Sequence, residues 1–231
     1  MATETPPSGR DSSVASKVQI LATEHWSLLA TRALTYQESL GRVNMFLAIL
    51  SGAVIALALV AQADHFGPAF ISIAIFMLTV VLFAGVFTVA RLIALNRDDF
   101  RWVIAMNRLR NAYVQLHPDL EPNLTTSPYD DLPGALQTLG IDRTGADRLG
   151  SAVHGLQTLP GMLSVIVAAD GGAIGALIAA GFGAPRVVVL LAGIALFVFV
   201  EGWMFMWGRR VVRSLDPSLR ARFPTPPGPP T

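Results

Sequence analysis

The sequence contains no cysteine and few charged residues. Without cysteine there can be no disulfide, no thiolate nucleophile and no cysteine-based metal site. Charged residues make up 14% of the chain and the net charge is +1, so no broad electrostatic field indicates nucleic acid or another polyanion as a partner. Paired-histidine, Gly-rich phosphate-binding and Ser-His-Asp patterns are also missing. We therefore expect a protein that is not an enzyme and has no cofactor or metal.

Long apolar runs dominate what remains. Hydrophobic residues make up 52% of the chain and the mean hydropathy is +0.52, which is too apolar for an ordinary soluble domain. Residues 45–61 and 69–90 carry no charge, and each approaches the roughly 20 residues that a helix needs to cross a hydrocarbon core of about 30 Å. Residues 62–68, which end in Gly-Pro, separate them. The pattern predicts a transmembrane helical hairpin.

A second pair of apolar runs covers residues 159–182 and 187–207, with a short turn between them. Thr158 is a suitable N-cap for the first of these helices, and Pro160 suits its first turn. The sequence therefore predicts an all-α membrane protein with four transmembrane helices arranged as two hairpins in membrane lipid.

Helix is expected to continue from the first hairpin on both sides. Little interrupts a helix from residue 14 to the first span, and no Gly or Pro follows the second span before Pro118. Both extensions carry an apolar stripe at helical spacing, which calls for a partner helix. The stripe residues are Val14, Val18, Leu21, His25, Leu28 and Leu29 in the first extension, and Leu92, Leu95, Phe100, Val103, Met106, Leu109, Tyr113 and Leu116 in the second. We expect residues 14–116 to form the hairpin and an antiparallel two-helix cytoplasmic stalk.

Three segments lie outside these helices. Residues 1–13 have almost nothing to bury and are expected to form a disordered tail, with no signal peptide before the spans. Residues 117–158 are expected to form a cytoplasmic connector with two short helices, at about 132–139 with Asp131 as N-cap and at about 144–156. Residues 208–231 are expected to form a basic and then Pro-rich tail, like polyproline from residue 224.

The distribution of basic residues predicts the orientation. Of 17 Lys and Arg residues, four precede the first span, seven lie between the second and third, and five follow the fourth. Only Arg186 falls in a loop on the other side. The positive-inside rule then places both termini in the cytoplasm of a multi-pass protein of the inner (plasma) membrane.

Two acidic residues lie within the predicted spans. Asp170 stands near the middle of the third span, where a charged carboxylate costs several kcal/mol. It is either an ion or proton site, or a protonated carboxyl that hydrogen-bonds across a helix contact. Glu201 of the fourth span could share a polar line with Asp170, although we favour an orientation toward Arg209 or Arg210.

Small residues surround Asp170 on the third span. Gly171 pairs with Gly175, and Ala168 with Gly172, at the four-residue spacing that permits close helix packing, within one chain or between chains. A weaker pair, Gly52 and Ala56, lies in the first span. His25 is expected to be a buried polar partner and not a metal ligand, because the other histidines lie in different segments.

Three stretches resemble a set of uncharacterised bacterial multi-span integral membrane proteins. They are residues 20–32 (ILATEHWSLLATR), the first span with Met45-Phe-Leu and Ser51-Gly-Ala-Val, and the segment that contains Asn96-Arg-Asp-Asp-Phe-Arg-Trp-Val. That resemblance implies no activity. The layout of a helix that leads into a hairpin and returns as helix is similar to the SLATT two-span effector domains, thought to form pores in nucleotide-triggered conflict systems. The second hairpin departs from that layout.

Two functions are consistent with these observations. The first is a non-enzymatic, homo-oligomeric pore or proton/cation path that involves Asp170. The alternative is a membrane scaffold whose stalk or Pro-rich tail binds a cytoplasmic protein. An intramembrane enzyme is disfavoured because Asp170 has no second acid at its depth, no His-rich cluster and no Ser nucleophile beside it.

Overall fold

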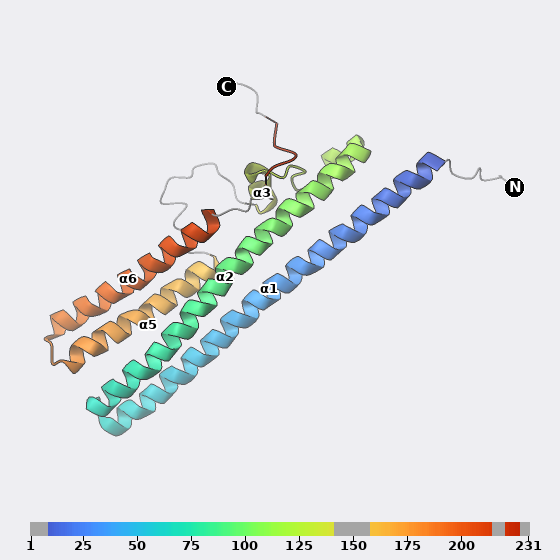
Figure 1. Ribbon diagram of the computed structural model, residues 1–231. Coiled ribbons are helices and arrows are strands. Elements are labelled where there is room, and N and C mark those ends of the chain that lie inside the picture. The colour runs from blue at the N-terminus through green and yellow to red at the C-terminus, as the bar shows by residue number, and fades with distance from the viewer. Residues whose placement is uncertain (1–8, 141–157, 214–219, 227–231) are drawn as a thin grey trace. The chain divides into compact units, whose positions relative to one another are not determined.

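Helices make up all the regular structure in the described part of the chain. The computed structural model describes residues 9–140, 158–213 and 220–226, and no strand occurs among them (Figure 1). The elements are α1 (Gly9–Asp64), α2 (Pro68–Leu116), the 3-10 helix η1 (Pro118–Asn123), α3 (Leu132–Thr138), α5 (Leu159–Gly181) and α6 (Arg186–Arg213). The expected all-helical fold class is confirmed at this level.

Among the residues that the structure describes, four helices are long and apolar enough to cross a membrane, as expected. They are α1, α2, α5 and α6. Half of the most apolar window of α5 is buried within the protein, against 11–22% for the other three. The other three helices therefore leave most of their apolar surface exposed, which suits a lipid environment.

The chain divides into two compact units. The first unit comprises Met1–Tyr36, Arg97–Thr144 and Asp216–Thr231, and the second comprises Gln37–Asn96 and Gly145–Leu215. Both long helices α1 and α2 contribute to each unit, because each helix continues without a break between its apolar and polar parts. The units are described separately below.

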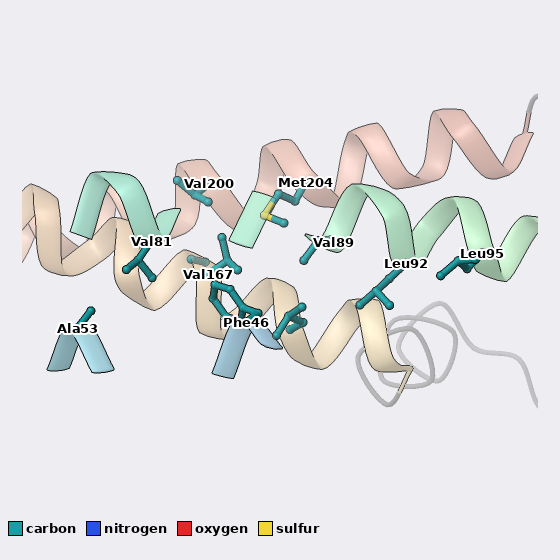
Figure 2. Close-up of a cluster of buried hydrophobic side chains, with 11 residues drawn as sticks. Phe46, Ala53, Val81, Val89, Leu92, Leu95, Val167, Val200 and Met204 are labelled. Atoms are coloured by element: carbon teal, nitrogen blue, oxygen red, sulfur yellow. The ribbon is translucent and has the colours of Figure 1, made fainter. Parts of the chain in front are cut away.

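The second unit contains the main apolar core, in which α1, α2, α5 and α6 all take part. Phe46 of α1 and Val167 of α5 are almost fully buried in it, with Val81 and Val89 of α2 and Met204 of α6; Figure 2 shows this cluster. A Cβ on Gly85 of α2 would lie 2.9 Å from Cε2 of Phe46, so a glycine is needed where α2 passes this ring.

Asp64 organises the turn between α1 and α2. Its carbonyl accepts from the N–H of Gly67 at 2.9 Å, and its carboxylate accepts from the N–H of Phe70 in the first turn of α2 at 2.7 Å. His65 and Phe66 adopt positive φ angles of 47° and 60°. The side chain of Asp64 therefore caps the helix that follows it.

The first unit is held by α1, α2 and α3. Val103 and Ile104 of α2 are buried against Ala135 of α3. The guanidinium of Arg32 on α1 donates two hydrogen bonds to Asp99 on α2, at 2.6 and 3.1 Å. Asp131 is the N-cap of α3, as expected, and accepts from the N–H of Gly134 at 2.9 Å.

Helix boundaries agree with the sequence in some places and differ in others. α2 ends at Leu116 and Thr158 caps α5, both as expected. α1, however, begins at Gly9 and not near residue 14, so residues 9–13 are helix and not disordered tail. α6 continues to Arg213 because no Gly or Pro interrupts residues 209–213, so this basic segment is not part of a tail.

The end of the chain also differs from expectation. Residues 220–226 are fixed to the first unit by hydrogen bonds from Arg222, Phe223 and Thr225, so the tail is not free from residue 208 onward. The 3-10 helix η1 was not expected, and the helix expected at 144–156 lies outside the described residues.

Candidate functional site

Asp170 lies on the buried side of α5 in the second unit. It is 7% exposed, and neither carboxylate oxygen has a hydrogen-bond partner in the described part of the chain. Asp170 follows Leu163 and Val167 at helical spacing, and these two residues belong to the apolar core. The expected alternative of a hydrogen bond across a helix contact therefore has no acceptor or donor among these residues.

An ionised carboxylate in such surroundings is costly. Since no N–H or O–H of the described residues donates to it, an ionised Asp170 would carry a penalty of several kcal/mol. Asp170 must therefore hold a proton, or exchange it with water that enters between the helices. This property makes it a candidate for proton transfer.

Glu201 of α6 contacts α5 through Ser164. The Oγ of Ser164 lies 3.0 Å from Oε1 of Glu201 and 2.8 Å from the carbonyl oxygen of Gly161. The hydroxyl has one proton and cannot donate fully to both acceptors. In the contact with α6 the Ser164 hydroxyl is the donor and the carboxylate of Glu201 is the acceptor. Oε2 of Glu201 is buried without a partner in the described residues.

This position of Glu201 differs from the orientation that we favoured from the sequence. Glu201 reaches back to α5, whereas the guanidinium of Arg209 lies over the ring of Phe205, 5.4 Å from its centroid. The nearby hydroxyl on α5 provides a closer polar partner than an arginine two turns along the same helix.

The glycines near Asp170 bring α5 and α6 together within one chain. A Cβ on Gly172 would lie 3.0 Å from the carbonyl oxygen of Gly193, and one on Gly175 would lie 2.8 Å from that of Ala192. A Cβ on Gly171 would contact Val200 at 3.0 Å. By contrast, no atom of the described residues lies within 4 Å of the Cβ position of Gly52 in α1.

The structure thus places Glu201 in contact with Ser164, whereas Asp170 lies further along α5, away from this contact. Asp170 follows Ser164 by six residues, which corresponds to about 9 Å along α5 and about 120° around it. The sequence did not single out Ser164. Its signal is a hydroxyl in an apolar helix near a carboxylate, which is weak because serine is common in such helices.

Sequence reasoning also missed a buried carboxylate in the first unit. Asp130 is fully buried and accepts hydrogen bonds from the guanidinium of Arg108 at 2.7 Å and from the N–H groups of Arg222 and Phe223 at 2.9 and 2.7 Å. Burial opposes its ionisation, but these donors outweigh burial and lower the pKa of Asp130 below its ordinary value. Its partners lie far along the chain, so no local pattern indicates them.

His25 is a partly buried residue of α1 that faces α2 in the first unit. Its ring lies 6.1 Å from that of Tyr113, and its Nδ1 is buried without a partner in the described residues. Burial and the charge of Arg110 lower the pKa of His25, which favours the neutral ring. No group of three or more metal-binding side chains occurs in residues 9–140, 158–213 and 220–226.

Comparisons of the chain with protein-family models, with curated proteins and with solved structures find no match. The assignment of a function therefore depends on the chemistry of these side chains.

Proposed function

We propose that the protein spans the inner (plasma) membrane with α1, α2, α5 and α6 as two helical hairpins, with both termini in the cytoplasm. Four apolar helices and the concentration of basic residues outside the short loop at Arg186 support this arrangement. The polar parts of α1 and α2 would form the cytoplasmic stalk. Arg32 of α1 pairs with Asp99 of α2, and Glu38, which is later in α1, pairs with Arg91, which is earlier in α2. This order is the one that an antiparallel pair of helices requires.

Within this arrangement, the protein acts as a non-enzymatic path for protons or cations that involves Asp170. The observation that supports this function is the buried carboxylate of Asp170, unpartnered among the described residues, in a helix that carries no other charged residue. Acidic residues buried in membrane helices commonly mark proton relays and ion sites, because placing them in the membrane costs free energy that packing alone does not explain. The protein would act together with lipid and further copies of itself, and without nucleic acid.

Protons suit this site better than hydrated cations. α5 and α6 approach so closely at Gly172 and Gly175 that a single added carbon would meet backbone oxygen. A proton needs only a chain of exchangeable groups, and Ser164 and Glu201 provide two of them at 3.0 Å. Water would have to carry the proton over the remaining distance to Asp170.

Proton flux in liposomes tests this proposal. The purified protein is reconstituted with a pH-sensitive dye inside the vesicles, and a potassium gradient with valinomycin drives protons inward. Wild type should acidify the lumen, Asp170→Asn should lower the rate at least tenfold, and Glu201→Gln should lower it to a smaller extent. Glu121→Gln, at an exposed position of η1, is the matched control and should conduct like wild type. Equal flux in wild type and Asp170→Asn would exclude the path.

A membrane scaffold is the second candidate. The fixed segment 220–226 supports it, because this segment is held by hydrogen bonds within the first unit and the Pro-rich sequence follows it directly along the chain. A scaffold would show no flux in any variant. Asp170→Asn would then change only thermal stability, and removal of residues 227–231 would abolish binding of a cytoplasmic protein.

A further inference from the structure

The polar part of α1 exposes a regular apolar row. Ala22, Trp26, Leu29, Ala33 and Tyr36 follow one another at alternating spacings of four and three residues, and Leu40 is the next position on the same helix. We call the first five residues the α1 seam. Trp26 is 71% exposed, Tyr36 is 62% exposed and Leu29 is 41% exposed. This spacing of 3.5 residues is that of helices that wrap around one another.

The seam is not the face that packs on α2. α1 meets α2 through a neighbouring face that carries Leu28, which is buried, but also His25, Arg32 and the buried Ser39. Over residues 25–39, alongside the seam, the face that packs on α2 is therefore more polar than the face that is exposed. This arrangement of the two faces is unfavourable for an isolated protomer, because apolar side chains remain in water while polar ones are buried.

Charge along the helix indicates what covers the seam. The charged residues Lys17, Glu24 and Glu38 share the face opposite the seam. Thr23, Ala30 and Gln37, which border the seam on the side away from α2, carry no charge. Two identical seams can therefore approach without bringing like charges together. These bordering residues also offer no charge that would favour a different, oppositely charged protein.

The area is sufficient for a specific contact. An aromatic side chain buries about 150–250 Å² when fully covered, so at the exposures of Trp26 and Tyr36 each copy would cover about 300 Å² of aromatic surface. With Leu29, Ala33 and Leu40, two copies would bury about 1,000 Å² in total, near the lower limit for a biological interface.

We propose that the α1 seam is the interface through which two copies of this chain associate. Copies inserted in one membrane have the same orientation, so their α1 helices run parallel and the seams meet around a two-fold axis. This inference rests on the membrane insertion and self-association in the proposed function, but does not require the proton path.

Disulfide cross-linking tests the interface. Since the chain has no native cysteine, only an introduced thiol can form a cross-link. Ala33→Cys places a thiol on the seam and Glu24→Cys places one on the opposite exposed face. After mild oxidation in membranes, Ala33→Cys should give at least fivefold more disulfide-linked dimer than Glu24→Cys, because only seam residues bring the two Cβ atoms near the required 3.5–4.5 Å. Equal cross-linking of the two variants would overturn the proposal.

A second pair of variants tests the contact itself. Tyr36→Glu in the Ala33→Cys background should abolish the cross-link, while Ser27→Glu, at an exposed position off the seam, should retain it. Both should keep wild-type helical content by circular dichroism. A cross-link that survives Tyr36→Glu would reject the seam as the interface. The seam would also be rejected if the Ala33→Cys variant is a monomer and its thiol does not react with maleimide, because another part of the same chain would then cover the seam. Cross-linking without proton flux would reject the proton path alone, and flux without cross-linking would reject the seam alone.

Discussion

The N–H of Phe223 donates a hydrogen bond to Oδ1 of Asp130 at 2.7 Å, and the N–H of Asp130 donates in return to the carbonyl of Phe223 at 3.1 Å. These residues are 93 positions apart in the chain. The same carboxylate accepts from Arg108, and Thr225 donates through its N–H and its hydroxyl to Asp131. Two adjacent acidic residues thus fix segment 220–226 to the first unit.

Asp130→Asn should destabilise the first unit by about 3 kcal/mol, because the change leaves the guanidinium of Arg108 without its buried carboxylate partner. It should also release the end of the chain. Trypsin cleavage after Arg220 and Arg222, followed by mass spectrometry, should become at least tenfold faster. Asp119→Asn, an exposed acid in η1, is the control and should leave the rate unchanged.

Acid should have the same effect on the wild-type protein. Since the donors lower the pKa of Asp130 below 3.8 in the folded state, its contribution is present in full above that pH and is lost as the pH falls through the folded value. Hydrogen exchange at the N–H of Phe223 should therefore lose protection below about pH 3.8, and insensitivity to acid would contradict the assigned role.

His25 should make stability depend on pH in a second range. Its pKa is lowered from 6.5 by burial first and by Arg110 second. Below pH 6.5 the unfolded chain takes up a proton that the folded ring resists, so stability decreases as the pH falls from 7 toward the folded pKa. Thermal unfolding should show this decrease in wild type and a flatter profile in His25→Gln.

Gly175→Ala should destabilise the contact between α5 and α6 by about 1–3 kcal/mol, because the new Cβ would lie 2.8 Å from the carbonyl oxygen of Ala192 and the backbones would have to separate. Gly202→Ala of α6 is the matched control, since its Cβ position has no neighbour within 4 Å in the described part of the chain. Thermal unfolding in detergent should separate the two variants by several degrees, and similar midpoints would show that α5 and α6 tolerate a wider spacing.

The ion pair between Arg32 and Asp99 should contribute about 1 kcal/mol in a double-mutant cycle. Its two hydrogen bonds give fixed geometry, but both side chains are 30% exposed, so solvent screens the attraction. The pair of Asp98 and Arg101, at 3.6 Å on one helix, should give a coupling energy close to zero and serves as the comparison.

The sequence predicts local features of this protein well. The end of α2 before His117, the cap of α3 at Asp131 and the cap of α5 at Thr158 all follow from residues within one helical turn. The four long apolar helices follow from composition and length alone. Each of these features depends on interactions between near neighbours, which a single sequence displays directly.

Features that depend on residues far apart in the chain could not be predicted from the sequence. Asp170 stands out as an acid in an apolar run, but its lack of a partner among the described residues depends on what four helices place around it. Ser164 and Glu201 are 37 residues apart and meet across the contact between α5 and α6, which Gly172 and Gly175 bring close together further along the two helices. Asp130 is the clearest case, because its donors Arg222 and Phe223 lie in a segment that composition alone classifies as tail.

The fixed segment also affects how the protein matures during synthesis. Asp130 leaves the ribosome 93 residues before Phe223, a delay of about 5–20 s at common rates of translation. During that interval α5 and α6 are made while the carboxylate still lacks two of its donors. The first unit therefore reaches its final form only after both later helices exist, and in a chain truncated before residue 222 the carboxylate of Asp130 would keep its bond from Arg108 but lose the N–H donors of Arg222 and Phe223.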